Sequence, residues 1–119
     1  MDADPKADYP STFSANAFAC EALCETVRIM KSERLVEKAR HIGSVIGKWS
    51  KGRFQGRGAA WAAELSSQKE VDAVCARCLK NGLIVMNTFQ KTVKIAPPLV
   101  ISMKDLETGL DILQEAMNG

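Results

Sequence analysis

Apolar residues between Ala15 and Trp49 recur at every third or fourth position, which is the spacing of amphipathic helices with one buried stripe. The first pattern predicts a helix that begins at a cap formed by Ser14 or Asn16. Its apolar stripe comprises Phe18, Ala19, Leu23, Cys24, Val27 and Met30.

A second helix is predicted from Glu33, with Ser32 as its N-cap and Gly52 at the end of the region. Lys31 and Ser32 mark the expected kink between the two helices. The stripe of the second helix comprises Leu35, Ala39, Ile42, Ile46 and Trp49.

The middle of the chain changes to one strand and a further helix. Residues 54–65 include Gly56 and Gly58 and predict a single strand, whose small residues allow close packing against a neighbour. The serines at 66–67 precede a helical pattern, which the Asn–Gly pair at 81–82 ends because both residues tolerate the left-handed conformation of a helix C-cap. One face of this helix comprises Val71, Val74, Cys75, Cys78 and Leu79.

A hairpin and a last helix follow. Short strands are predicted over residues 83–86 and 92–96, with a turn over residues 88–91. Ser102 has Asp105 three residues later, which is a near match to a helix capping box. The stripe of the last helix comprises Leu106, Leu110, Leu113 and Met117.

The order helix, helix, strand, helix, strand, strand, helix predicts an α+β fold. We expect a small, mainly antiparallel sheet of about three to four strands, covered by helices on one face. Residues 1–9 form a polar arm in this interpretation, and residues 10–119 form a single domain that starts with a linking helix.

Composition excludes several classes of function. The chain has 119 residues, of which 46% are hydrophobic, and its interspersed charges leave a formal net charge of +2 without the basic run that nucleic-acid binding favours. No apolar segment approaches the ~20 residues of a membrane span, and the N-terminus is acidic where a signal peptide would be basic. We therefore expect no nucleic-acid or membrane partner, and a location in the cytoplasm or an organelle matrix.

The segment TVKIAPPLVI, residues 92–101, carries the main candidate for binding chemistry. In a strand, Val93 and Ile95 share one face while Lys94 points to the other, and the prolines at 97–98 end the strand because they cannot donate to a sheet ladder. Lys94 is thus held on a rigid platform, which suits an anion such as a carboxylate. Taken alone, a solvated lysine on an exposed strand face is the more frequent situation.

The four cysteines do not predict a metal site. Cys75 and Cys78 have the spacing of a metal or redox pair, and Cys20 and Cys24 could add two thiolates, but each pair lies within a helical pattern. The single histidine, His41, is expected at the boundary or surface of another helix. We therefore predict no metal, and core or half-buried thiols.

Three blocks, in order, resemble the class III, pyridoxal-phosphate-dependent aminotransferases of the ornithine, acetylornithine and 4-aminobutyrate type. YPSTFSANAFAC resembles the family segment His-Gly-Ser-Thr-Phe-Gly-Gly-Asn-Pro-Leu-Ala-Cys, and FQGRGAAWAAEL resembles its Val-Arg-Gly-x-Gly-Leu strand. GLIVMN, VKIAPPLVIS and the acidic helix after them resemble its closing strands and terminal helix. The resemblance starts near Tyr9 and implies the C-terminal small domain of a fold type I enzyme.

The resemblance implies roles for three residues. Thr12, with Ser11 beside it, matches the hydroxyl residues that bind the cofactor phosphate across the dimer interface. Lys94 occupies the position where many members have an arginine that holds the substrate carboxylate. Lysine provides a point charge without the two-pronged guanidinium of arginine. Gln55 is a second departure, because it stands where arginine is usual ahead of Gly56.

The implied activity transfers an amino group from an amino acid or ω-amino compound to a 2-oxo acid. That reaction needs a lysine that forms an aldimine with pyridoxal phosphate, and in the family this lysine lies upstream of the first block. We therefore assign no catalytic residue, and we expect the chain to be a fragment or domain that is inactive alone and works with a large cofactor-binding domain and a homodimer partner. The alternative is a catalytically dead, stand-alone module that binds small anions or another protein.

Overall fold

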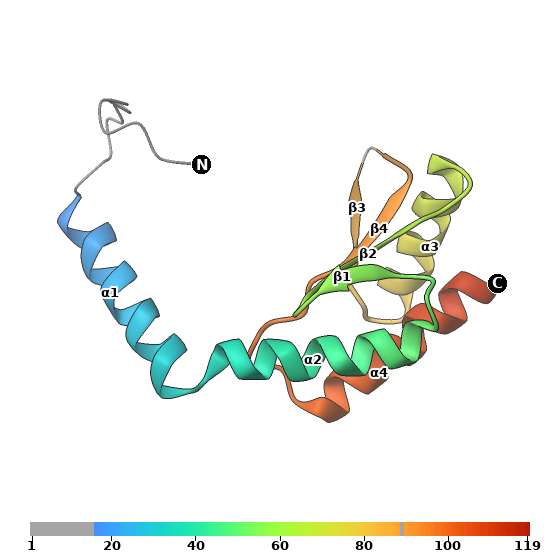
Figure 1. The fold of residues 1–119 in the computed structure, drawn as a ribbon. Helices are drawn as coiled ribbons and strands as arrows, with labels where there is room; N and C mark the ends of the chain where they lie inside the picture. Colours follow the sequence, from blue (N-terminus) through green and yellow to red (C-terminus); the bar gives the residue numbers. More distant parts are fainter. Residues whose placement is uncertain (1–15, 89) are drawn as a thin grey trace, which may run out of the picture. The chain divides into compact units, whose positions relative to one another are not determined.

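A computed structural model describes residues 16–88 and 90–119 of the protein (Figure 1). The chain divides into two compact units, Met1–Glu33 and Arg34–Gly119. The described residues of the first unit form helix α1 (Ala17–Ser32). The elements of the second unit are α2 (Leu35–Ser50), β1 (Gln55–Arg57), β2 (Ala60–Glu64), α3 (Gln68–Lys80), β3 (Met86–Thr88), β4 (Thr92–Ile95) and α4 (Met103–Asn118).

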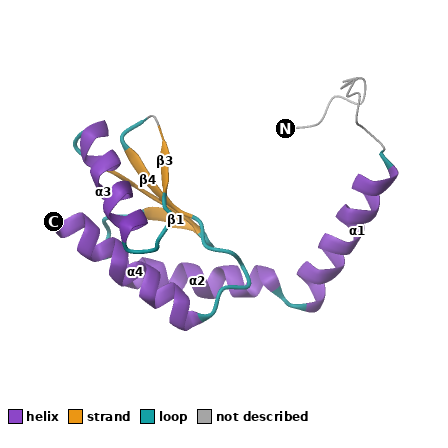
Figure 2. Cartoon of the chain, turned by 180° about the vertical axis from the view of Figure 1, so that it is seen from behind, coloured by secondary structure: helices purple, strands orange, loops and turns teal. Residues whose placement is uncertain are grey.

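The second unit is an α+β fold, as predicted. Its four strands form one antiparallel sheet in the order β1-β2-β4-β3. Figure 2 shows α2, α3 and α4 beside the sheet. These three helices contribute side chains to a single core with one face of the sheet. The strands that carry the candidate binding residues are therefore supported from behind by all three helices.

The prediction of one strand over residues 54–65 is wrong, because the segment folds back on itself as the hairpin of β1 and β2. Gly58 has a positive φ of 57° at the turn, a conformation that glycine adopts without steric cost. Gly56 pairs with Trp61 across this hairpin, where a Cβ would lie 2.2 Å from the carbonyl oxygen of Ala60. The expectation that the glycines permit close backbone approach is thus confirmed at Gly56.

The second hairpin is shifted relative to its prediction. β3 begins at Met86 and not at residue 83, whereas β4 begins at Thr92 as expected. In the observed register Met86 lies opposite Lys94, so residue 83 would lie opposite Pro97, which has no N–H to donate. Leu83 instead turns toward α4, where its Cδ1 atom lies 3.4 Å from the position of a Cβ on Gly109.

The boundary between the first two helices also differs from its prediction. Ser32 does not cap α2; it is the last residue of α1, and its hydroxyl donates to the carbonyl of Ile29 at 3.3 Å. Arg34, with a positive φ of 53°, directly precedes α2. At the other end of α1, the Asn16 side chain accepts a hydrogen bond from the backbone of Ala19 and caps the helix, as one of the two predicted caps.

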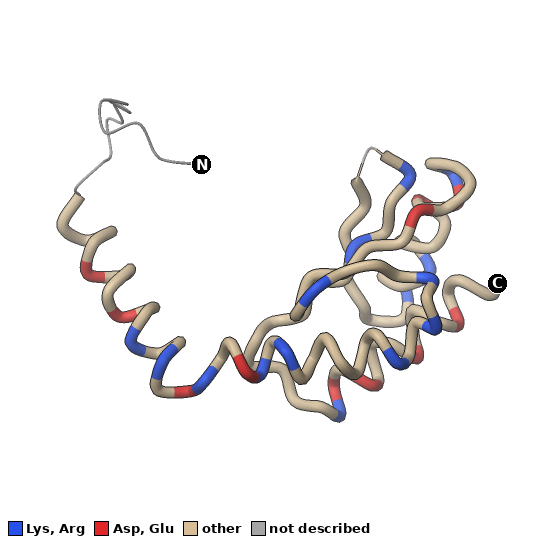
Figure 3. The backbone as a smooth tube through the Cα atoms, in the orientation of Figure 1, with Lys and Arg blue, Asp and Glu red and all other residues tan. Residues whose placement is uncertain are grey.

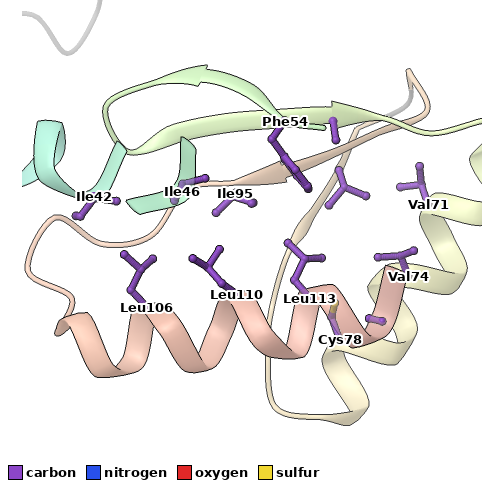
Figure 4. Close-up of a cluster of buried hydrophobic side chains, with 13 residues drawn as sticks. Ile42, Ile46, Phe54, Val71, Val74, Cys78, Ile95, Leu106, Leu110 and Leu113 are labelled. Atoms are coloured by element: carbon purple, nitrogen blue, oxygen red, sulfur yellow. The ribbon is translucent and has the colours of Figure 1, made fainter. Parts of the chain in front are cut away.

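The core confirms most of the predicted helical stripes. Figure 4 shows leucines of α4 pointing toward Ile42 and Ile46 of α2 and Ile95 of β4. The largest fully buried side chains among the described residues are Ile42, Ile46, Leu113, Val71, Val74, Val93 and Cys78. The prediction that Leu79 belongs to the buried face of α3 is wrong, because its side chain is 63% exposed.

α1 has no buried residue among those described. Three of its apolar side chains, at i, i+4 and i+7, share one helical face and are exposed: Leu23, Val27 and Met30. The predicted apolar face of α1 is therefore present, but no other described residue buries it.

Basic and acidic residues are interspersed along the chain, which agrees with the prediction from the sequence (Figure 3). In residues 16–88 and 90–119, no helix combines the length and the apolar character that crossing a bilayer requires.

Candidate functional site

Lys94 lies on an interior strand of the sheet and points away from the core. Its neighbours Val93 and Ile95 are buried, whereas Lys94 is exposed, so the predicted alternation is confirmed. The residue pairs with Ala62 of β2 on one side and with Met86 of β3 on the other. Strands on both sides therefore fix the backbone that carries this cation.

Gln55 lies in the same cross-strand row as Lys94. It pairs with Ala62, and Ala62 pairs with Lys94, so the three side chains share the outer face of the sheet. Both Gln55 and Lys94 stand where arginine is usual in the family, but the sequence pattern does not place the two residues together. The missing information was the turn at Gly58, because without it β1 and β2 are one strand and Gln55 has no partner.

A hollow of about 270 Å³ lies on this outer face. Lys94 and Gln55 line it, together with the small side chains of Ala60 and Ala62, and Lys94 is its charged residue. The alanine methyl groups leave open space between the longer side chains. The hollow can therefore admit a small group that accepts hydrogen bonds.

Lys94 also borders a second hollow, of about 300 Å³, at the end of the sheet. Its lining is largely apolar and comes from residues 83–86, from residues 95–98 and from α4. Asp105 is its acidic residue, and the Ser102 hydroxyl donates to the Asp105 carboxylate at 2.7 Å. Lys94 is thus the cation common to both hollows.

Trp61 stabilises the β1–β2 hairpin from the inner face of the sheet. Its Nε1 atom donates to the carbonyl of Gly58 at 2.8 Å, and the half-buried ring packs against the core. Trp49 is half-buried in the same way, and its ring lies 5.4 Å from that of Phe54. The two tryptophans are packing residues, as the stripe position of Trp49 predicted for that residue.

The sequence profile of the family Aminotransferase class-III matches residues 1–117. The chain belongs to the class III aminotransferases. The resemblance found in the three sequence blocks is thereby confirmed.

Two relatives of the chain are named as aminotransferases. The chain is 31% identical over 109 residues to the acetylornithine aminotransferase of Archaeoglobus fulgidus, across 89% of this chain and 28% of the relative. It is 26% identical over 113 residues to the probable mitochondrial ornithine aminotransferase of Caenorhabditis elegans, across 89% of this chain and 27% of the relative. The chain therefore spans less than a third of the length of these relatives.

Solved structures share the fold. A transaminase from the marine bacterium Virgibacillus superposes with a TM-score of 0.84 at 21% identity, over 94% of this chain and 30% of that one. The acetylornithine aminotransferase of Elizabethkingia anophelis gives a TM-score of 0.81 at 22% identity, over 94% of this chain and 32% of that one. At these identities, the likeness supports the fold of a class III domain.

The residues predicted to bind the cofactor phosphate, Thr12 and Ser11, lie outside the described residues. Their role in this class III chain stays a prediction from the family motif. Lys94 is the predicted site residue that the structure describes.

The described lysines of this chain share one environment. Each lysine in the described ranges, from Lys31 to Lys104, is exposed. A lysine that forms a Schiff base near neutral pH needs a lowered pKa, which commonly comes from burial in an apolar pocket or from a neighbouring cation. By this criterion, none of the described lysines is set apart as a Schiff-base lysine.

The cysteines of the class III chain occupy two different environments. Burial raises the pKa of the Cys78 and Cys75 thiols, which lie buried and half-buried on α3 as predicted. Cys20 and Cys24 are exposed on α1, so the expectation of core or half-buried thiols is wrong for them.

Other candidate ligands are dispersed. Within the described ranges, no three side chains of the types His, Cys, Asp or Glu gather as a metal site would require. His41 is exposed on α2, as predicted.

Proposed function

We propose that this chain is the C-terminal part of a pyridoxal-phosphate-dependent aminotransferase, which transfers an amino group from an amino acid or ω-amino compound to a 2-oxo acid. The family match over residues 1–117 and the names of the relatives support this proposal. The observation that carries it is the position of Lys94, which lies in the segment that resembles the family's closing strand, is exposed and lines two hollows.

Lys94 binds the substrate carboxylate in this proposal. The ammonium group is exposed on a strand that is paired on both sides, so a carboxylate can approach it without disturbing the core. A charged hydrogen bond between ammonium and carboxylate is stronger than a neutral one. Because lysine lacks the fork of arginine, it fixes the distance of the carboxylate better than its orientation.

The cofactor half of the reaction lies outside the described residues. Pyridoxal phosphate, when bound, supplies an electron sink for the carbon that carries the amino group. Thr12 and Ser11 would donate hydroxyl hydrogen bonds to its phosphate in the partner subunit of a homodimer. A large domain would supply the Schiff-base lysine, and the chain alone would be inactive.

We assign this activity to the cytoplasm or an organelle matrix. The relative from Caenorhabditis elegans is named as mitochondrial, and the chain carries no helix suited to a membrane within the described ranges. Fractionation of cells with an antibody against residues 34–119 tests the assignment, and recovery of the chain from the secreted fraction would contradict it.

A titration with pyridoxal phosphate tests the proposal that the Schiff-base lysine belongs to a large domain and not to this chain. The purified chain is mixed with the cofactor, reduced with borohydride and digested for mass spectrometry. We expect no site-specific adduct, because the described lysines are all exposed and none is set apart by burial. One stoichiometric adduct on a single lysine would contradict the proposal that the catalytic lysine lies elsewhere.

Sequencing of the transcript that encodes the chain separates the two function classes. We expect a lysine-containing large domain, encoded either in frame with residues 1–119 or as a separate subunit that co-purifies with them. If neither is found, the stand-alone anion-binding or protein-interaction module replaces the aminotransferase.

A further inference from the structure

Gln55 and Lys94 are the two polar side chains that line the hollow on the outer face of the sheet. They lie on β1 and β4, on either side of Ala62 of β2, in one cross-strand row. Adjacent strands are about 4.8 Å apart, so the two backbones are separated by roughly 10 Å. Long side chains that lean toward each other across an alanine can span this distance and leave room for a small group between their tips.

Both side chains are available for a ligand. Gln55 and Lys94 are exposed, and neither makes a side-chain hydrogen bond or ion pair with another residue in the described part of the chain. By contrast, polar side chains near the N-terminal end of α3 form hydrogen bonds with other residues. Gln68 donates to both Asp72 and Asn87. The hollow is thus lined by two hydrogen-bond donors, on the same face of the sheet, that no other described residue uses.

We infer that Gln55 is a second donor to the carboxylate that Lys94 binds, and that the two residues together orient a singly charged carboxylate. This inference rests on the proposed function of Lys94. The ammonium group donates to one carboxylate oxygen and the Gln55 amide nitrogen donates to the other. Two residues on separate strands then provide the two-point contact that a single arginine makes with its fork.

The charge of the pair restricts the ligand. Lys94 brings one positive charge and Gln55 brings none, so the hollow matches a group with one negative charge. The other charged side chains of the outer face lie in neighbouring rows, with Arg57 opposite Ala60 and Glu64 opposite Thr92. They carry opposite signs and do not line the hollow.

Binding of a small carboxylate to the full chain tests the inference. Sodium propionate is the probe and propionamide is its neutral counterpart, and the backbone amide of Ala62 and the side-chain amide of Gln55 report binding in nitrogen–proton NMR spectra. We expect saturable shifts with propionate and none with propionamide. The absence of saturable shifts with propionate would overturn both the inference and the role of Lys94.

Substitutions at Gln55 give effects in opposite directions. Gln55→Ala should weaken propionate binding about threefold to tenfold, because one hydrogen bond to a charged group is lost. Gln55→Glu should abolish binding by placing a like charge in the hollow. Gln55→Arg should strengthen binding about tenfold, which no merely structural role of position 55 predicts.

Matched variants separate this inference from the proposal on which it rests. Gln90→Ala and Gln90→Glu change an exposed glutamine of the β3–β4 turn, away from the hollow, and should leave the affinity within about twofold because charges at this distance are screened. If Lys94→Ala abolishes binding while the Gln55 variants bind like the unaltered chain, Gln55 has no role and Lys94 keeps its own. If Lys94→Ala has no effect, the role of Lys94 fails and the pairing fails with it.

Discussion

Gly43 of α2 lies against the backbone of Gly58 in the turn between β1 and β2. A Cβ on Gly43 would lie 2.6 Å from the carbonyl oxygen of Gly58, which also accepts the hydrogen bond from Trp61 Nε1. The helix and the turn can approach this closely only because residue 43 has no side chain. The contact fixes the hairpin that carries Gln55 and Ala62.

Replacement of Gly43 by alanine should destabilise the protein. Alanine improves helix propensity by about 1 kcal/mol, but forcing a methyl group against backbone atoms costs about 1–3 kcal/mol. The Gly58 carbonyl accepts a hydrogen bond from Trp61, so moving it away from the methyl group would break this bond. We therefore expect a net loss of up to about 2 kcal/mol in the free energy of unfolding, measured by urea denaturation.

Gly109→Ala in α4 is the matched control. A Cβ there meets only Leu83 Cδ1 at 3.4 Å, which is ordinary contact with a side-chain end. The higher helix propensity of alanine should therefore dominate, and the free energy of unfolding should increase by about 0.5–1 kcal/mol. Equal effects of the two substitutions would refute the steric account of Gly43.

Ser102 should stabilise α4 through its side chain. Its hydroxyl oxygen accepts from the backbone N–H of Asp105 at 3.0 Å, and the hydroxyl donates to the Asp105 carboxylate. Ser102→Ala should lower the free energy of unfolding by about 0.5–2 kcal/mol. Ser44→Ala, at an exposed position inside α2, should change it by less than about 0.5 kcal/mol in the favourable direction.

Local patterns predicted those parts of the fold that short-range rules determine. The alternation of Val93, Lys94 and Ile95 gave the faces of β4, and the Ser102 signal gave the start of α4. The periodic positions of α2 and α4 gave most of the core.

Long-range pairing was not available from those patterns. A strand and a hairpin have the same alternation until the turn is located, and Gly58 was interpreted as a packing residue although it is the turn. The partnership of Gln55 and Lys94 depends on that turn and on the pairing of β2 with β4. The start of β3 could not be predicted for a similar reason. It depends on the register of β3 with β4, in which residue 83 would lie opposite Pro97.

Glu70 should titrate below an ordinary glutamate. Hydrogen bonds from the Ser66 hydroxyl and the Ser66 backbone N–H lower the pKa of Glu70 from its ordinary value of 4.5. A lowered folded-state pKa contributes stability above the unfolded-state pKa, and this contribution is lost as the pH falls through the folded-state pKa. Ser66→Ala should raise the pKa of Glu70 toward the ordinary value in a carbon-13 NMR titration, whereas Ser102→Ala should leave it unchanged.

The four cysteines should react with iodoacetamide at different stages. Cys20 and Cys24 are exposed and should be modified in the native protein, whereas Cys78 is buried and has a raised pKa. We expect Cys78 to be modified only when the protein unfolds, as peptide mass spectrometry with and without urea would show. Modification of Cys78 as fast as Cys20 in native buffer would contradict its burial.

The apolar face of α1 should promote self-association of the chain. Leu23 and Val27 lie on this face and are exposed. Leu23→Gln combined with Val27→Gln should reduce the mass measured by light scattering at high concentration, since glutamine keeps the helix and removes the apolar surface. Glu21→Gln, on the opposite side of the helix, is the control, and a monomeric unaltered chain would contradict this prediction.

The pairing of Lys94 on both sides, with its side chain directed outward, has a consequence for how such a domain can change during evolution. The residues that hold the strand in place are Val93 and Ile95, and they share no face with the cation. Exchanges among lysine, arginine and neutral residues at positions 94 and 55 can therefore accumulate without a compensating change in the core. If Lys94 binds the ligand as proposed, ligand preference and foldability depend on separate residues of β4.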